Sequence, residues 1–150
     1  MCGFIGIVTK DKTTNNILSE NKRIICRGPD ETKNFKSSDD EINIDFLFNR
    51  LSILELSSNG SQPMVSEDGD HIMMFNGEIF NYIELKKYLK EHNTSFVSKN
   101  SDAEVLFLGI RKEGKEFIKK LIGQFSIVYL DKSKKEILLV RDRTGQKPLF

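Results

Sequence analysis

Apolar runs and polar stretches alternate along the first third of the chain and predict two strands with a helix between them. Residues 4–9 are short, apolar and β-branched, which is typical of a buried strand. Residues 13–26 carry apolar side chains at a moderately helical spacing, and the Gly-Pro pair at residues 28–29 requires this helix to stop. The polar residues 31–45 predict a hairpin or surface loop that leads into an alternating strand over residues 42–46.

The middle of the chain predicts a central strand followed by a helix. The apolar run at residues 71–75 is typical of such a strand. We expect the strand to end at the Asn-Gly-Glu sequence of residues 76–78, where glycine permits a sharp turn. Asn81 and Glu84 have the spacing of a helix N-cap and its reciprocal partner, which predicts a helix over residues 82–91.

The last third of the chain predicts a second helix and a β-hairpin. Ser101 and Glu104 repeat the capping spacing, and apolar residues then fall on one side of a helix that ends near Gly114. Residues 124–130 and 137–140 form two apolar strands around a charged turn. Antiparallel strand pairs with separate helices favour layered α+β architecture over a doubly wound sheet.

Composition narrows the classes of partner. The chain has 150 residues, which favours one domain, and its net charge of +1 arises from 23 basic and 22 acidic residues. This balance gives no overall field suited to nucleic acid or an anionic membrane. A small neutral or zwitterionic ligand fits the composition better.

Cysteine and histidine usage indicates a reducing compartment and no metal. Cys2 and Cys26 allow at most one disulfide, and no stretch resembles a signal peptide or a membrane span. We therefore expect a cytoplasmic protein. His71 and His92 do not pair with each other or with the cysteines at a metal-ligand spacing, so we predict no metal site.

The residue best suited to covalent chemistry is Cys2. Removal of Met1 would give Cys2 both a thiol and a free α-amine, which are a nucleophile and a base in one residue. The α-amine, with an unperturbed pKa of about 7.7–8.0, can accept the thiol proton near neutral pH, and the thiolate is the reactive form. A cysteine can also occur here by chance, in front of an ordinary buried strand.

Three further segments carry candidate site residues, and each has two interpretations. Arg50 lies in a mostly apolar stretch, where it forms a structural ion pair or clamps a ligand carboxylate. Asn76-Gly77 is a turn or an oxyanion hole, and Asp102 is a favourable helix-terminal charge or an acceptor for a ligand ammonium. Together with Cys2, they describe a pocket for an amino acid with a reactive carboxamide, which is glutamine.

Seven short motifs also occur in collinear order along the chain. They are MCGFIGIV at 1–8, RGPD at 27–30, NRLSIL at 49–54, QPM at 62–64, NGEIFN at 76–81, SDAEV at 101–105 and RDRTGQKPL at 141–149. This set resembles the glutaminase domain of glutamine-dependent asparagine synthetases, a class II glutamine amidotransferase of the N-terminal nucleophile hydrolase group. Glucosamine-phosphate synthases and purine amidotransferases share the terminal cysteine and the NGE-type motif. However, RGPD, RLSI and the DRxGxKPL ending favour the asparagine synthetase branch.

The resemblance implies an α+β fold, a four-layer α/β/β/α sandwich of two antiparallel sheets. It implies Cys2 as the nucleophile, its α-amine as the base, and the Asn76 side chain with the Gly77 N–H as the oxyanion hole. It also implies Arg50 as the residue that binds the glutamine α-carboxylate. Leu51, Ile53 and Leu54 would line the pocket, and Glu78 and Asp102 would accept hydrogen bonds from the α-ammonium.

The chain departs from the family pattern at two positions. Family members usually carry histidine before RGPD, where this chain has Cys26, and another histidine where this chain has Phe48. Neither position belongs to the implied catalytic set. We therefore expect altered loop packing rather than lost chemistry.

The resemblance treats residues 1–150 as one glutaminase domain, C-terminally truncated and without the synthetase domain of the family. The expected reaction is hydrolysis of glutamine to glutamate and ammonia through a Cys2 thioester, without a cofactor; ATP and Mg²⁺ are expected only for the absent synthetase domain. Expected partners are L-glutamine and a synthetase domain or subunit that uses the ammonia, most commonly to amidate aspartate. Two alternatives stay open: a related amidotransferase with another acceptor, and a non-catalytic domain that binds an amino acid or a partner.

Overall fold

The computed structural model of the chain describes residues 1–10, 17–38 and 42–150. The strands are β1 (Gly3–Thr9), β2 (Glu31–Ser38), β3 (Asn43–Arg50), β4 (Met64–Val65), β5 (His71–Ile79), β6 (Gly123–Asp131) and β7 (Glu136–Arg141). The α-helices are α1 (Ile17–Glu20), α2 (Tyr82–Glu91), α3 (Asp102–Glu113) and α4 (Lys115–Ile118). Short 3₁₀ turns lie at η1 (Asn21–Arg23), η2 (Ile25–Arg27) and η3 (Ser58–Gly60). Every helix among the described residues is too short or too polar to cross a membrane.

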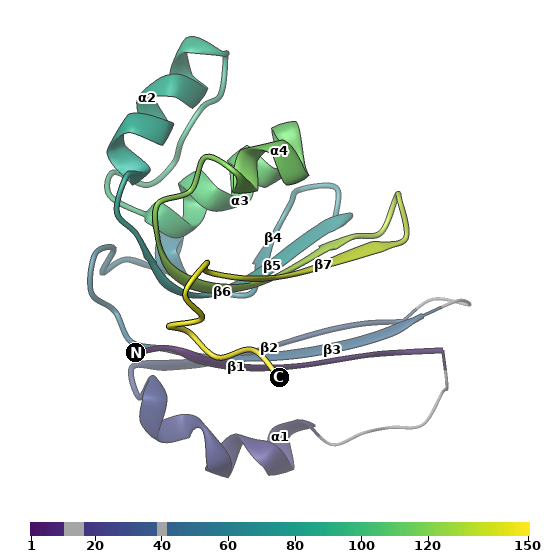
Figure 1. Cartoon of the computed structure of the whole chain (residues 1–150). Helices are drawn as coiled ribbons and strands as arrows, with labels where there is room; N and C mark the ends of the chain where they lie inside the picture. Colours follow the sequence, from purple (N-terminus) through teal and green to yellow (C-terminus); the bar gives the residue numbers. More distant parts are fainter. Residues whose placement is uncertain (11–16, 39–41) are drawn as a thin grey trace.

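The strands form two antiparallel sheets that lie face to face (Figure 1). One sheet has three strands in the order β1-β3-β2, and the other has four in the order β4-β5-β6-β7. Figure 1 shows α2, α3 and α4 over the outer face of the four-stranded sheet, and α1 on the outer face of the three-stranded sheet. The predicted α+β sandwich with α/β/β/α layers is confirmed.

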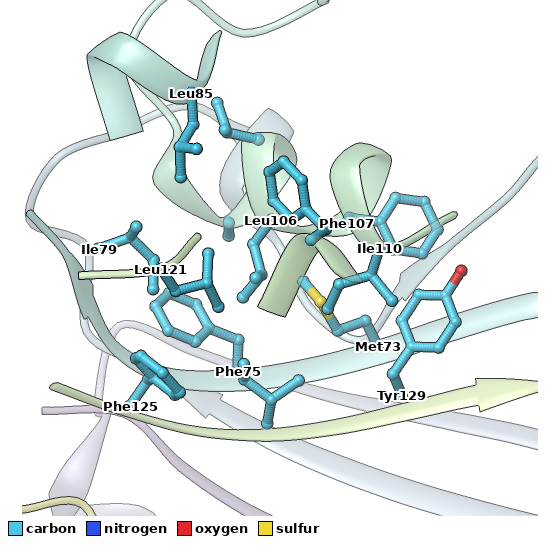
Figure 2. Close-up of a cluster of buried hydrophobic side chains, with 14 of the residues drawn as sticks. Met73, Phe75, Ile79, Leu85, Leu106, Phe107, Ile110, Leu121, Phe125 and Tyr129 are labelled. Atoms are coloured by element: carbon cyan, nitrogen blue, oxygen red, sulfur yellow. The ribbon is translucent and has the colours of Figure 1, made fainter. Parts of the chain in front are cut away.

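The four-stranded sheet contributes to two separate cores because successive residues of a strand point to opposite faces. Met73 and Phe75 of β5 face the helices, where they pack in one cluster with Leu106 of α3 (Figure 2). Met74 faces the other sheet, where it packs in a second cluster with Phe46 of β3. Burial of both faces explains why β5 and β6 are continuous apolar runs in the sequence.

Strand β5 extends further than its sequence predicts. The expected end at residues 76–78 is wrong, because Asn76, Gly77 and Glu78 continue the antiparallel pairing with β6. A Cβ atom on Gly77 would lie 2.0 Å from the carbonyl oxygen of Gln124, so this glycine permits the close approach of β6 rather than a turn. The consequence is that Asn76 and Gly77 lie on a rigid central strand.

The predicted helix over residues 13–26 is also wrong as a continuous element. Residues 17–27 instead form α1 followed by η1 and η2, while residues 13–16 lie outside the described part of the chain. The side chain of Asn21 accepts a hydrogen bond from Asn49 Nδ2 at 2.6 Å, which ties this segment to β3. This tertiary contact competes with a regular helix.

The two predicted helix caps have different outcomes. The Ser101 side chain accepts from the N–H of Glu104 at 3.1 Å, and α3 ends at Gly114, as predicted. Asn81 does stand at the N-cap position of α2, but its side chain does not cap the helix. It bonds the carbonyl of Lys120 at 2.9 Å and the N–H of Ile122 at 3.0 Å instead. Asn81 therefore joins the start of α2 to the segment before β6.

Candidate active site

The thiol of Cys2 lies at the start of β1, beside the loop that follows β3. The N–H of Leu51 donates to Cys2 Sγ at 3.4 Å, and Arg27 Nε donates to the Cys2 carbonyl at 3.0 Å. Cys2 is half-buried and is not in a disulfide. The nucleophile candidate is thus fixed by its backbone and remains accessible through its side chain.

The RGPD motif supports both Cys2 and the loop next to it. Gly28 packs so closely on β3 that a Cβ atom would lie 2.3 Å from the carbonyl oxygen of Asn49. The N–H of Asp30 donates to the Arg50 carbonyl at 3.1 Å, and the Asp30 carboxylate accepts from the N–H of Ser52 at 2.7 Å. With Arg27 on the Cys2 carbonyl, the motif holds the nucleophile and the residue 50–54 loop together.

Arg50 ends β3, where the structure shows one of its two predicted interpretations, the ion pair, while the clamp on a ligand carboxylate stays a prediction. Its guanidinium is 3.4 Å from the Glu31 carboxylate and donates to the Glu55 carbonyl, so a structural ion pair is present. The same side chain is 7% exposed and lines the cavity beside Cys2. Gly60 leaves room for the Arg50 side chain, because a Cβ atom at position 60 would lie 2.4 Å from Arg50 Nη2.

Next to the cavity, the backbone along one edge of β5 forms hydrogen bonds with side chains rather than with a neighbouring strand. Gln62 accepts from the N–H of Phe75 at 2.6 Å and donates to its carbonyl at 3.2 Å. The Asp102 carboxylate accepts from the N–H of Ile79 at 3.2 Å. Alternate residues of an antiparallel strand direct their backbone N–H groups to the same side, so Gly77 directs its N–H to this edge as well. Gly77 lines the cavity, which makes this N–H a candidate oxyanion donor.

The side chain of Asn76 faces the opposite way from that of Phe75, toward the sheet that contains β1. Asn76 is 5% exposed and lines the same cavity as the Cys2 thiol. Its carbonyl lies 3.5 Å from Ser126 Oγ on β6, which holds the backbone of β5 at this point. A side-chain amide and an adjacent backbone N–H therefore border the cavity that contains the thiol.

Asp102 begins α3 and accepts hydrogen bonds from the backbone of Ile79 and of Ala103. Its pKa is raised from 3.8 to about 6, mainly because burial disfavours the carboxylate. The hydrogen bonds partly offset this rise, and the charge of Glu78 adds to it. A buried carboxylate of this kind is poised to gain from a cation placed beside it.

These residues share one open cavity of about 160 Å³. All the predicted site residues border it: Cys2, Arg50, Leu51, Ile53, Leu54, Asn76, Gly77, Glu78 and Asp102. The sequence interpretation missed Gln62, Glu55 and Lys147, which border it too. Gln62 and Lys147 lie within the QPM and RDRTGQKPL motifs, so motif membership was the signal that could have found them.

The two departures from the family pattern lie outside the cavity. Phe48 is fully buried between the sheets, where its ring stacks on Phe4 with centroids 6.4 Å apart. Cys26 is exposed on η2. Within residues 1–10, 17–38 and 42–150, no three or more His, Cys, Asp or Glu residues cluster as a metal site would require.

Comparison with known proteins shows the family of the chain. A family model described as the glutamine amidotransferase domain matches residues 1–150. The chain is 42% identical over 156 residues to asparagine synthetase [glutamine-hydrolyzing] 2 of Bacillus subtilis (strain 168), a match covering 100% of this chain and 20% of that protein. It is 37% identical to asparagine synthetase [glutamine-hydrolyzing] 1 of the same strain, with 100% and 24% covered. A putative asparagine synthetase [glutamine-hydrolyzing] 2 of Methanocaldococcus jannaschii is 36% identical, with 100% and 32% covered.

A solved structure shares the fold. It is glutamine phosphoribosylpyrophosphate amidotransferase from B. subtilis, in complex with ADP and GMP, and it matches with a TM-score of 0.54 and 20% identity. The match covers 67% of this chain and 24% of that one. This chain spans 20–32% of the length of the curated relatives named above. The family match over residues 1–150 and the agreement in sequence show that the chain belongs to the glutamine amidotransferase domain family.

Proposed function

We propose that this chain hydrolyses the side-chain amide of glutamine to glutamate and ammonia, with Cys2 as the nucleophile. The observation that carries the proposal is one cavity lined by a thiol at the second residue, an amide and a backbone N–H on β5, the buried guanidinium of Arg50 and the buried carboxylate of Asp102. Family membership and relatives named as glutamine-hydrolyzing enzymes support it. The buried charges match the two charges of an amino acid, and the thiol and oxyanion donors match its carboxamide.

The proposed mechanism is acyl transfer. The free α-amine of Cys2 accepts the thiol proton, and the thiolate attacks the amide carbon of glutamine. Asn76 and the N–H of Gly77 stabilise the oxyanion of the tetrahedral intermediate. The amide nitrogen of glutamine takes up the proton held by the Cys2 α-amine and leaves as ammonia, which gives a γ-glutamyl thioester. Water then hydrolyses the thioester and regenerates Cys2.

Release of Met1 is a requirement of this mechanism. In the chain that begins with Met1, the nitrogen of Cys2 is an amide and cannot act as a base. Met1 itself borders the cavity, so its removal also enlarges the space beside the thiol. A chain that retained Met1 would favour the alternative of a domain that binds an amino acid or a partner without catalysis.

The direct test is to incubate the purified protein, with its N-terminus confirmed as Cys2 by mass spectrometry, with glutamine. We expect glutamate and ammonia in equal amounts and no release from asparagine, which is one methylene shorter. Absence of glutamate above the protein-free blank would reject the proposed reaction. Use of the ammonia to amidate aspartate, with ATP and Mg²⁺, would belong to a synthetase domain or subunit like that of the asparagine synthetases.

Replacing Arg50 with lysine should raise the KM for glutamine about 10–100-fold and change kcat much less. The guanidinium can bond the α-carboxylate through two N–H groups, whereas lysine offers a point charge. Glu31→Gln is the matched control, because it removes the ion-pair partner of Arg50 and leaves the guanidinium. Steady-state kinetics decide the matter: equal KM increases in both variants would assign Arg50 to a structural role.

Glutamine binding should weaken as the pH falls through about 6, because Asp102 then becomes protonated and loses the charge that attracts the α-ammonium. The affinity should change by up to about tenfold per pH unit below this value. Calorimetric titration of the Cys2→Ala variant measures binding without turnover. Asp102→Asn should bind more weakly at pH 7 and lose the pH dependence, and a retained dependence would exclude Asp102 as its source.

A further inference from the structure

Lys147 is a buried cation beside the nucleophile. It is 6% exposed and borders the same cavity as Cys2. Among the described residues, no carboxylate lies within 4.0 Å of its ammonium, and its polar contact there is the sulfur of Met1, with Nζ and Sδ 2.7 Å apart. Buried lysine side chains are almost always paired, so this unpaired charge calls for a functional explanation.

The chain fixes Lys147 in this position through both of its backbone polar groups. The Asp142 carboxylate accepts from the N–H of Lys147 at 3.0 Å, and Arg141 Nε donates to its carbonyl at 3.1 Å. Asp142 also accepts from the N–H of Phe125 at 3.1 Å, which anchors the loop to β6. Pro148 follows and restricts the backbone further. The ammonium is therefore held next to the N-terminus by a rigid loop rather than by a flexible tail.

We propose that Lys147 is a positioning residue that acts through Cys2: its charge keeps the Cys2 amine free of a proton and favours the thiolate near neutral pH. This inference rests on the proposed function, in which Met1 is removed. Removal of Met1 takes away the sulfur that Lys147 contacts and turns the peptide nitrogen of Cys2 into a free α-amine. Standard bond lengths place Lys147 Nζ within about 9 Å of the Cys2 nitrogen.

The sign of the effect follows from like and unlike charges. A nearby cation disfavours the ammonium form of an amine and favours a thiolate, so Lys147 should favour the reactive, unprotonated forms of both groups of Cys2. At this upper limit of about 9 Å in a partly buried site, the charge should move the midpoint of Cys2 reactivity by on the order of one pH unit.

The other charges that border the cavity are paired or carry the opposite sign. They are Arg50, paired with Glu31, and the carboxylates of Glu55, Glu78 and Asp102. Arg27 also lies near Cys2, where it donates to the Cys2 carbonyl, but it does not border the cavity and is unchanged in every variant tested below. Lys147 is the cation in this described set that borders the cavity without an acidic partner. Replacing Lys147 with a neutral residue should therefore favour the protonated forms of Cys2.

The test is the pH dependence of Cys2 alkylation by iodoacetamide, measured by mass spectrometry on the Met1-processed protein carrying Cys26→Ala. We expect Lys147→Met to move the midpoint upward by about one pH unit, and Lys147→Arg to stay close to the parent protein. Lys119→Met, on the exposed surface, should leave the midpoint unchanged. Lys147→Gln replaces Lys147→Met if that variant does not fold. An unchanged midpoint in the neutral variants, or an equal shift in Lys147→Arg, would overturn the inference.

A second readout separates this inference from the proposed function. In the kcat/KM profile for glutamine, Lys147→Met should move the limb that rises with pH to higher pH, because the amine must lose its proton first. If the parent protein does not release glutamate, the proposed reaction fails while alkylation still reports on Lys147. If the parent protein is active and neither profile moves, the role of Lys147 fails alone.

Discussion

Replacing Cys2 with alanine should abolish glutamine hydrolysis. The substitution removes the atom that attacks the amide and leaves the rest of the cavity intact, since the backbone contact from Arg27 to the Cys2 carbonyl does not need the side chain. No other described cysteine borders the cavity, because Cys26 lies exposed on η2. We therefore expect turnover to fall to the protein-free rate while glutamine still binds.

Glutamate release and calorimetric binding together measure this effect. Cys26→Ala is the matched control, since it removes the second thiol of the chain without touching the cavity and should keep full activity. Appreciable turnover by the Cys2→Ala protein would contradict the nucleophile assignment. Loss of binding as well as turnover would mean that alanine disturbs the pocket.

The second large effect is expected at Asn76. Replacing it with alanine should lower kcat about 10²–10³-fold, because one of two oxyanion donors is lost. KM should change little, since the donor acts on charge that develops after binding. The folded state should persist, because Asn76 keeps its backbone pairing with Ser126 on β6.

Steady-state kinetics and thermal unfolding check the Asn76 prediction. Asn59→Ala is the matched control, because Asn59 is exposed on η3 and should not affect kcat. If the melting temperature fell so far that unfolding explained the lost rate, Asn76 would have a structural role in the core instead. An increase in KM at unchanged kcat would assign it to ground-state binding instead.

Local patterns predicted much of the fold, and non-local contacts account for most of what they missed. The Ser101 cap and the β6–β7 hairpin were predicted because they depend on neighbours in sequence. The extension of β5 through Asn76 was not predicted, since Asn-Gly usually turns and only pairing with β6 keeps it extended here. The side chain of Asn81 was misassigned for the same reason, because its partners lie some 40 residues away.

The candidate site divides in a similar way. Cys2, Arg50, Asn76 and Asp102 were each predicted with a second interpretation, and the structure brings all four to one cavity. Lys147 was missed, although it lies in the RDRTGQKPL motif, because its place beside Cys2 depends on a loop that Asp142 anchors to β6. No spacing rule reports such a contact before the fold is known.

The measurement that tests the central claim most directly is covalent trapping by a diazoketone analogue of glutamine. We expect one adduct per chain, found by peptide mass spectrometry on Cys2 of a chain that lacks Met1. An excess of glutamine should prevent the adduct, and Asn76→Ala should slow its formation. An adduct on Cys26, or the absence of an adduct on a chain that begins with Cys2, would contradict the account.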